Sequence, residues 1–281
     1  MRYVVITPAF NEQEYIRQTL ESIVNQELLP LEWVIVNDNS TDDTAAIVEE
    51  YTKQYPWIKL VNKKGEDDRK IGAKVVRIFY HGLDHVSEKE FDFLVKLDAD
   101  LELPLNYFKE VAEAFNSHPK LGICAGYCII PSNGQWLEEK VAHWHTRGAM
   151  KAYRRECFKS IGGIKEVMGW DGIDDITAMS KGWETKTLRL AVKHFRPTGQ
   201  ASDPIKLRMK QGKSYYQRGY GFILTTIRML SKFYSTGSPY EIYVMKGFFD
   251  AWRTKTPKCV EPEVEKFTRR FQYRRIFKLK Y

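Results

Sequence analysis

Three apolar segments of this chain each end in polar residues, and this pattern most constrains the fold. The segments span 3–9, 31–36 and 93–97. After the first, Ile16, Leu20 and Ile23 fall on one helical face, with Asn11 expected as the N-cap. Strands that alternate with helices form a mainly parallel sheet, and ligands bind where such strands end. We therefore expect an α/β fold with a central sheet flanked by helices, and a site at the carboxyl edge of the sheet.

The third segment ends in two carboxylates, Asp98 and Asp100, with Ala99 between them. Residues two apart on an extended chain point to the same side. If the strand ends after Asp98, the pair can hold a hard divalent cation against a diphosphate. The alternative is a polar turn with a solvated Asp, because Asp-x-Asp is common by chance. Alone, the pair indicates a sugar-nucleotide site only in outline.

Three ordered motifs give the acidic pair its context, namely 8–12 (PAFNE), 36–42 (VNDNSTD) and 97–100 (LDAD). Their order and approximate spacing resemble those of family 2 glycosyltransferases of the GT-A fold. The resemblance extends from residue 1 to about 195, with Asn37 at a position where the family often has Asp. It implies a Rossmann-like catalytic domain that uses a nucleoside-diphosphate sugar, expected to be a UDP-sugar, as its donor.

The resemblance also implies binding residues at each strand end. For the nucleotide-sugar these are Pro8, Ala9, Phe10, Glu12, Asp38, Arg69, Asp98, Ala99 and Asp100. Asp98, Asp100 and His194 are the implied ligands of a Mn²⁺ or Mg²⁺ cofactor. Two of these assignments have a simpler alternative. Arg69 lies in a charged stretch typical of a solvated loop, and a lone His194 after a strand is often only capped or solvated.

Asp174 and Asp175 are the expected catalytic acids. They are predicted to open a helix that ends at Gly182, where acids also stabilise the helix dipole. The resemblance aligns them with a Glu-Asp pair in which one acid is the general base, and we expect Asp175, with Asp174 as the alternative. The implied reaction is one inverting displacement that moves a hexosyl group to a hydroxyl of a glycan or lipid-linked acceptor. Trp170 is expected either to stack on the acceptor sugar or to belong to the core.

The length of 281 residues fits one catalytic domain with an appendage. We expect a GT-A domain over 1–200, with a nucleotide-sugar half at 1–103 and an acceptor half at 104–200, followed by a helical extension over 201–281. No stretch approaches the roughly 18 consecutive apolar residues of a membrane span, and the first strand follows the initial Met too closely for a signal peptide. We therefore expect a cytoplasmic protein.

The formal net charge of +8 is concentrated near the C-terminus, where residues 269–280 alternate cations with aromatic and aliphatic side chains. This segment either lies on the inner face of an anionic membrane or packs on the domain as a helix. No nucleic-acid-binding motif accompanies the charge, so we expect no nucleic-acid partner. Two other functions are considered. A nucleotidyltransferase would need a Gly-rich loop after its first strand, whereas this chain has residues 8–12 (PAFNE) there. A sugar-nucleotide-binding protein without transferase activity would lack the general base, for which this chain offers Asp174 and Asp175.

Overall fold

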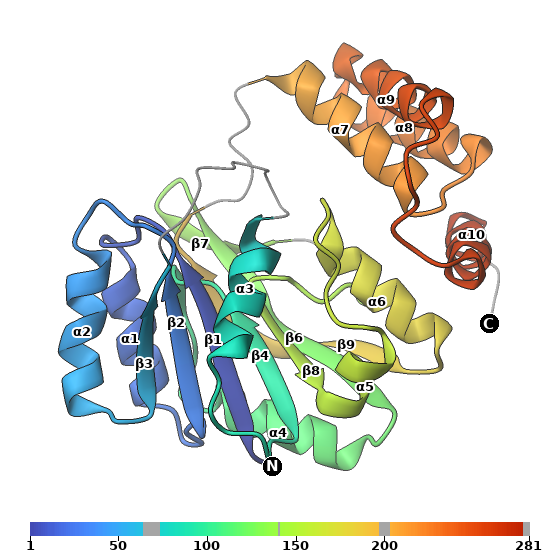
Figure 1. Ribbon diagram of the computed structural model, residues 1–281. Helices are drawn as coiled ribbons and strands as arrows, with labels where there is room; N and C mark the ends of the chain where they lie inside the picture. Colours follow the sequence, from blue (N-terminus) through green and yellow to red (C-terminus); the bar gives the residue numbers. More distant parts are fainter. Residues whose placement is uncertain (64–73, 140, 197–202, 278–281) are drawn as a thin grey trace.

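The computed structural model describes residues 1–63, 74–139, 141–196 and 203–277. Within these ranges, nine strands form one mixed sheet with helices on both faces (Figure 1). The strand order is β3-β2-β1-β4-β8-β6-β9-β5, and β7 pairs with β6. Further helices of the C-terminal part stand to one side of this sheet (Figure 1). The predicted α/β fold with a helical C-terminal extension is confirmed.

The first half of the sheet is parallel, and the second half is mixed. The parallel strands are β1 (Tyr3–Ala9), β2 (Glu32–Asn37), β3 (Ile58–Asn62) and β4 (Phe93–Leu97). The others are β5 (Leu101–Glu102), β6 (Leu121–Ser132), β7 (Gln135–Glu138), β8 (Met150–Arg154) and β9 (Glu184–His194). β8 runs antiparallel to both β4 and β6, while β6 and β9 are parallel. Because β1, β2 and β4 are parallel, their polar carboxyl ends meet at one edge, as predicted.

Two hydrophobic cores sandwich the sheet. One face is covered by α1 (Ile16–Val24), α2 (Thr44–Gln54) and α4 (Tyr107–Ser117), and the other by α3 (Lys74–Asp84), α5 (Arg155–Ser160) and α6 (Trp170–Ser180). Along β1, Tyr3 and Val5 pack into the first core, and Val4 and Ile6 pack into the second. Continuous burial of this kind is typical of a parallel strand covered on both faces.

The loop after β1 corrects one prediction, because Asn11 is not a helix N-cap. Helix α1 begins at Ile16 with Tyr15 at the N-cap position. Asn11 has a left-handed backbone with φ 53°, which Asn tolerates better than most residues because its side chain bonds locally. Its Oδ1 accepts a hydrogen bond from Thr41 N at 2.8 Å, and its own N–H donates to Ser40 Oγ at 3.0 Å. Asn11 therefore joins the loops after β1 and β2.

The C-terminal part consists of α7 (Pro204–Gln217), α8 (Phe222–Thr236), a short 3₁₀ helix (Pro239–Glu241), α9 (Ile242–Arg253) and α10 (Pro262–Ile276). Helices α7 and α9 approach closely at Gly212, where an added Cβ would lie 1.9 Å from the carbonyl oxygen of Val244. Helix α10 packs on α6, with Val264 and Phe271 buried against Ile176. None of the helices in the described ranges has both the length and the hydropathy of a membrane span. The predicted boundary near residue 200 stays a prediction.

Candidate active site

A cavity of about 550 Å³ opens at the carboxyl edge of the parallel strands. Every predicted nucleotide-sugar residue within the described ranges lines it: Pro8, Ala9, Phe10, Glu12, Asp38, Asp98, Ala99 and Asp100. The predicted metal ligand His194 and the predicted acceptor contact Trp170 line it as well. Arg69 lies outside the residues that the structure describes. The structure thus brings together residues that are far apart in the sequence.

One end of the cavity combines an aromatic ring, a carboxylate and a cation. Asp38, at the end of β2, is buried, and its carboxylate pairs with Lys74 Nζ at 2.5 Å. The same ammonium lies 5.2 Å from the centroid of the Phe10 ring, which is 45% exposed. An exposed ring can stack on a nucleobase, and a carboxylate can accept a hydrogen bond from a base N–H. Lys74 was not among the predicted site residues.

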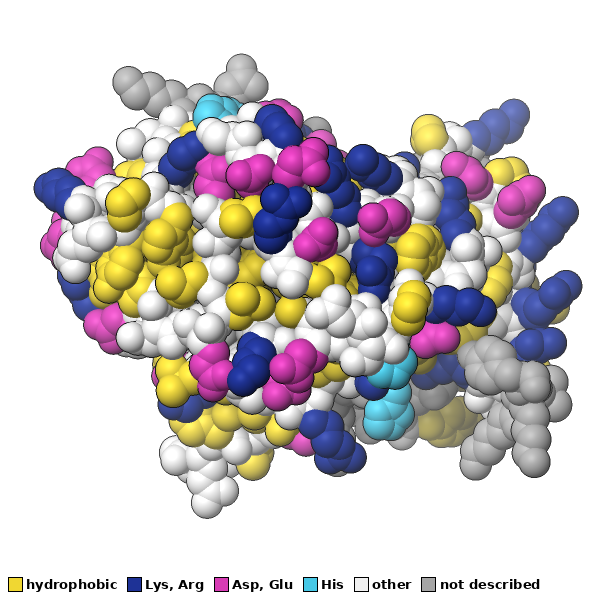
Figure 2. Space-filling view, turned by 90° about the horizontal axis from the view of Figure 1, so that it is seen from below, with side chains coloured by type: hydrophobic (Ala, Val, Ile, Leu, Met, Phe, Trp, Pro, Cys, Tyr) yellow, Lys and Arg dark blue, Asp and Glu magenta, His cyan; other side chains and the backbone are white. Residues whose placement is uncertain are grey.

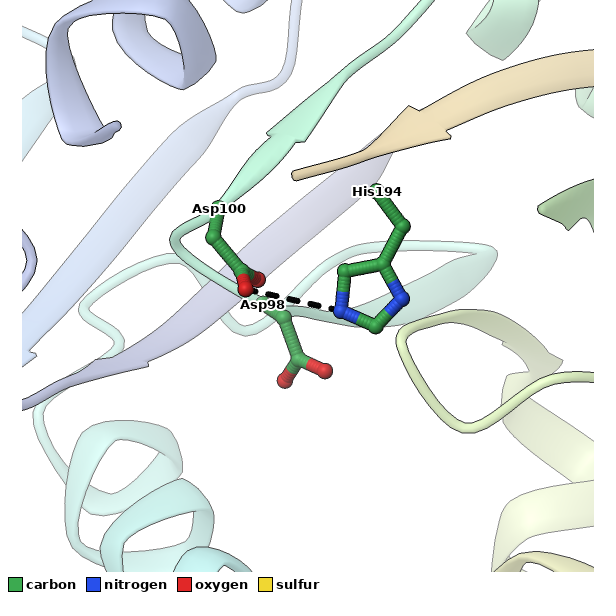
Figure 3. Close-up of side chains that lie close together, drawn as sticks. All are labelled: Asp98, Asp100 and His194. Carbon is green, nitrogen blue, oxygen red and sulfur yellow. Dashed lines mark ion pairs between the residues drawn. The ribbon is translucent and has the colours of Figure 1, made fainter. Parts of the chain in front are cut away.

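The acidic group of the cavity consists of Asp98, Asp100 and His194 (Figure 3). One ligand atom from each lies within 4.8 Å of the others, and His194 Nε2 is 3.5 Å from Asp100 Oδ2. The sheet explains this proximity, because β5 pairs with β9 and places Leu101 opposite His194. The late histidine is therefore held beside Asp100 by backbone register.

Cations balance these carboxylates. Lys96 Nζ pairs with Asp98, and Arg196 pairs with Glu12 and lies 3.5 Å from Asp100. Burial alone would lower the pKa of His194, but the carboxylates of Asp100 and Asp98 outweigh it and raise that pKa to about 10. Two carboxylates and one neutral imidazole form a donor set that suits Mn²⁺, so binding of the cation would release the proton of His194. The residues present therefore fit a divalent cation. Lys96 and Arg196 were not predicted, although each lies two residues from a predicted ligand on an extended segment.

Asp174 and Asp175 lie inside α6 and not at its start, which corrects the predicted helix boundary. The helix begins at Trp170, after Gly169 with φ 77°. Both carboxylates are buried, and neither lines the cavity. Asp174 accepts hydrogen bonds from Lys151 Nζ at 2.7 Å and from the Tyr153 hydroxyl. Burial and the neighbouring Asp175 raise the pKa of Asp174.

The carboxylate of Asp175 is enclosed by hydrogen-bond donors. Its carboxylate accepts hydrogen bonds from the Thr146 backbone N–H at 2.9 Å, the Thr146 hydroxyl at 2.6 Å and His145 Nδ1 at 3.0 Å. Lys151 Nζ lies 3.0 Å from the same carboxylate. With these donors around it, Asp175 has no open side toward the cavity. The prediction that Asp175 or Asp174 is the base stays a prediction.

Asp171, one turn earlier on α6, is the carboxylate of this helix that faces the cavity. Its side chain is 27% exposed and lies 3.4 Å from His145 Nε2. Burial alone would raise the pKa of Asp171, but the hydrogen bond to His145 and the charges of Lys151 and Arg218 lower it. Burial would likewise lower the pKa of His145, but Asp171 and Asp175 raise it to about 9. An ionised carboxylate that faces the cavity is thus fixed by an imidazolium. Asp171 was not predicted, although it lies four residues before Asp175 and therefore on the same side of the helix.

Trp170 forms part of the cavity wall next to Asp171. Its ring lies 5.3 Å from Lys96 Nζ and 5.8 Å from Lys151 Nζ. Gly148 allows the ring to lie there, because a Cβ at this position would come within 2.8 Å of the indole. The ring is largely buried, so it serves the core as well as the cavity. Its contact with an acceptor stays a prediction.

The N-terminal part of the chain matches known proteins in sequence. A family model described as Glycosyl transferase family 2 matches residues 4–165. An uncharacterized glycosyltransferase of Mycoplasma pneumoniae is 30% identical over 179 residues, which are 58% of this chain and 56% of that protein. The GalNAc(5)-diNAcBac-PP-undecaprenol beta-1,3-glucosyltransferase of Campylobacter jejuni is 30% identical over 135 residues, which are 48% of this chain and 40% of that protein. The chain therefore spans about half the length of these relatives, or less.

Solved structures match in fold. TarS (residues 1–349) of S. aureus, in complex with UDP-GlcNAc, gives a TM-score of 0.57 at 20% identity and covers 75% of this chain and 65% of that one. The mannosyltransferase PcManGT of Pyrobaculum calidifontis, in complex with GDP-Man and Mn²⁺, gives 0.54 at 17% identity and covers 99% of this chain and 88% of that one. These matches confirm the predicted GT-A architecture.

Proposed function

Because the chain belongs to glycosyl transferase family 2, we propose that it is a metal-dependent, inverting glycosyltransferase. It would move a hexosyl group from a nucleoside-diphosphate sugar, and we favour a UDP-sugar, to a hydroxyl of a glycan or lipid-linked acceptor. One observation carries the proposal. A single cavity joins the Phe10 and Asp38 end, the acidic group of Asp98, Asp100 and His194, and the carboxylate of Asp171.

The names of similar proteins support the donor, the metal and the acceptor class. TarS was solved with UDP-GlcNAc, and PcManGT with GDP-Man and Mn²⁺. The Campylobacter jejuni relative is named for a diphosphate-linked undecaprenol acceptor. For this chain we propose Asp98, Asp100 and His194 as the groups that hold Mn²⁺ or Mg²⁺. When bound, the cation supplies positive charge that stabilises the diphosphate leaving group.

The protein's own side chains supply the remaining steps. Phe10 and Asp38 hold the nucleobase of the donor, while Lys96 and Arg196 add positive charge where the diphosphate lies. We propose that Asp171 accepts the proton of the acceptor hydroxyl. The low pKa of Asp171 keeps it ionised, and the hydroxyl becomes acidic as its oxygen bonds to the anomeric carbon, so proton transfer comes late in the displacement. Attack from the face opposite the leaving group inverts the anomeric centre.

A donor screen tests this function. We would incubate the protein with a panel of UDP- and GDP-sugars and Mn²⁺ or Mg²⁺, and measure release of nucleoside diphosphate with and without glycan acceptors. Release that depends on a sugar nucleotide and a metal supports the proposal. Tight binding without any release would favour the sugar-nucleotide-binding protein, and release of pyrophosphate from a nucleoside triphosphate would favour the nucleotidyltransferase.

We also propose that the C-terminal helices face an anionic membrane. The described part of the basic segment is helical and packed, since Phe271 is buried and Arg269 donates to the Gly219 carbonyl. Lys and Arg side chains project along the edge of the molecule on this side (Figure 2). Exposed apolar side chains lie on α8 and α9: Phe222, Ile223, Leu230, Phe233, Tyr234, Ile242, Phe249 and Trp252. Aromatic side chains combined with cations are typical of an interfacial surface.

A further inference from the structure

A second cavity, of about 500 Å³, lies between α6 and the C-terminal helices. His145 and Asp171 line it from the catalytic domain, and side chains of α7, α8 and α10 line it from the other side. Asp171 lines the first cavity as well. The two cavities therefore meet at the carboxylate that we propose as the base. Asp98 and Asp100 line the first cavity but not the second, so a ligand in the second cavity would contact Asp171 without lying beside the acidic pair.

The second cavity is strongly cationic. Arg208, Arg218, Arg228 and Arg275 line it, and Asp171 is the carboxylate in its wall within the described ranges. Arg208 is paired with a buried glutamate, Glu241, at 2.7 Å. Neither Arg218 nor Arg228 forms an ion pair with a carboxylate in the part of the chain that the structure describes. The positive charge of the cavity therefore exceeds its negative charge.

Three buried hydrogen-bond donors in the same wall lack acceptors within the ranges that the structure describes. Gln272 is 1% exposed, and its Oε1 accepts from Arg228 at 3.4 Å and from Arg275 at 3.3 Å. These two donors fix the amide orientation and leave Nε2 without a partner among the described residues. Trp144 Nε1 and Arg208 Nε are also buried without a partner there. Buried polar groups are normally satisfied, so a ligand rich in acceptor oxygens fits this wall.

Aromatic rings hold two of the guanidinium groups. Tyr215 and Tyr220 stack at 4.9 Å between ring centroids. The guanidinium of Arg228 lies 5.4 Å from the Tyr215 ring and 5.5 Å from the Tyr220 ring, and that of Arg218 lies 5.7 Å from Tyr220. A guanidinium that lies over a ring keeps N–H groups that can donate to a ligand, although one N–H of Arg228 already donates to Gln272. This geometry suits bidentate recognition of a phosphate.

We propose that the second cavity binds a phosphate or diphosphate group of the acceptor substrate, so that the acceptor of this enzyme is an anion. The inference rests on the proposed function, because it places the acceptor hydroxyl at Asp171. A phosphate offers only acceptor oxygens, which matches a wall of donors. A neutral glycan would bring hydroxyl donors that find few acceptors here, and it would bring no charge to balance Arg228, which forms no ion pair with a carboxylate among the described residues, or Arg218, which has only the nearby charge of Asp171. The phosphate belongs either to a lipid-linked diphosphate or to a soluble phosphorylated sugar or polyol.

Calorimetric titration with two phosphate probes tests the proposal. The full-length protein is first saturated with UDP and Mn²⁺, so that the catalytic cavity is filled, and is then titrated with glycerol 3-phosphate or with farnesyl diphosphate. We expect binding of at least one probe. Arg218→Gln and Arg228→Gln should each weaken it by roughly tenfold or more, since charged hydrogen bonds to the ligand are lost.

Two further variants separate charge from geometry and from general effects. Arg228→Lys keeps the charge but loses the planar guanidinium, so it should bind the probes more tightly than Arg228→Gln and more weakly than the unmodified protein. Arg253→Gln is the matched control, because Arg253 is an exposed arginine of the same helical region that does not line the cavity. It should bind the probes as the unmodified protein does. UDP affinity and the thermal midpoint, measured for every variant, show that each is folded.

The outcomes are distinguishable. Tighter arginine-dependent binding of farnesyl diphosphate supports a lipid-linked acceptor, and tighter binding of glycerol 3-phosphate supports a soluble phosphorylated one. The acceptor inference is wrong if UDP binds but neither probe does. It is also wrong if Arg228→Gln binds both probes with the same affinity as Arg253→Gln. If UDP and Mn²⁺ do not bind while the probes do, the result counts against the proposed function and not against the anion site.

Discussion

Replacing Asp171 with Asn tests the base that the geometry favours. The amide has the size of the carboxylate, so the cavity keeps its shape while its proton acceptor is lost. A general base typically contributes about 10²–10⁴-fold in rate, which corresponds to about 3–5 kcal/mol of transition-state stabilisation. We expect Asp171→Asn to lower turnover by that factor. UDP affinity should change little, because the residues proposed to contact the nucleobase and the diphosphate lie elsewhere in the cavity.

Asp175→Asn is the matched comparison on the same helix. The Asp175 carboxylate is buried among Thr146, His145 and Lys151. Removing one partner of a buried ion pair costs about 3–5 kcal/mol of folding stability. For a chain of this size, that loss lowers the thermal midpoint by roughly 6–20 °C. The structure therefore predicts a large stability change for Asp175→Asn and a large rate change for Asp171→Asn.

The assay follows UDP release from the best donor in the screen, at a temperature where all variants are folded. Calorimetry gives UDP affinity, and thermal unfolding gives stability. If Asp175→Asn melts like the unmodified protein, yet loses two or more orders of magnitude in turnover while Asp171→Asn stays active, the sequence-based assignment to Asp175 is right. The same pattern for Asp174→Asn would place the base there. Either result would refute the argument from cavity geometry.

Three further predictions follow from the same structure. Asp100→Asn should abolish the gain in UDP affinity that Mn²⁺ gives over a chelator, and calorimetric affinities that ignore the metal would refute the metal site. The pKa of His145 is raised from an ordinary 6.5 to about 9, so protonated His145 should stabilise the folded state by about 3 kcal/mol below pH 6.5 and lose this contribution as pH rises through 9. The difference in unfolding free energy between the unmodified protein and His145→Gln should therefore shrink over that pH range. A difference that does not depend on pH would contradict this prediction. Sedimentation with anionic vesicles should weaken with salt and with Trp252→Ser, whereas concentration-dependent self-association without vesicle binding would indicate a second copy of the chain on that surface.

The nucleotide end of the site could be predicted because its signals are local in sequence. Strands β1, β2 and β4 are short buried runs that end in polar residues, so the pattern alone places Asp38 and Asp98 at the carboxyl edge of the sheet, and the family resemblance adds their binding roles. His194 is different, because it reaches Asp100 only through the pairing of β5 with β9. Register between strands some 90 residues apart is a tertiary property. Only the family resemblance pointed to that histidine.

The second cavity could not be predicted at all. It depends on how α10 packs on α6 and on where α7 and α8 lie across the cavity from α6. The close contact at Gly212 holds α7 against α9, and the buried Phe271 holds α10 against α6. From the sequence, Arg218 and Arg228 are two of 44 basic residues with nothing to distinguish them. Their proposed function becomes visible only when the stacked tyrosines lie beside them, together with Gln272 Nε2, which has no hydrogen-bond partner among the described residues.

The buried acids of α6 then have a physical explanation other than catalysis. Lys151, on β8, is fully buried and bonds both Asp174 and Asp175. It also donates to the backbone carbonyl of Asp171. Buried ion pairs often add little net stability, yet they tolerate few alternative geometries. This network therefore fixes the rotation and height of α6 on the sheet. Asp171 is held by that helix at the junction of the two cavities, where a donor on one side and an anionic acceptor on the other would meet.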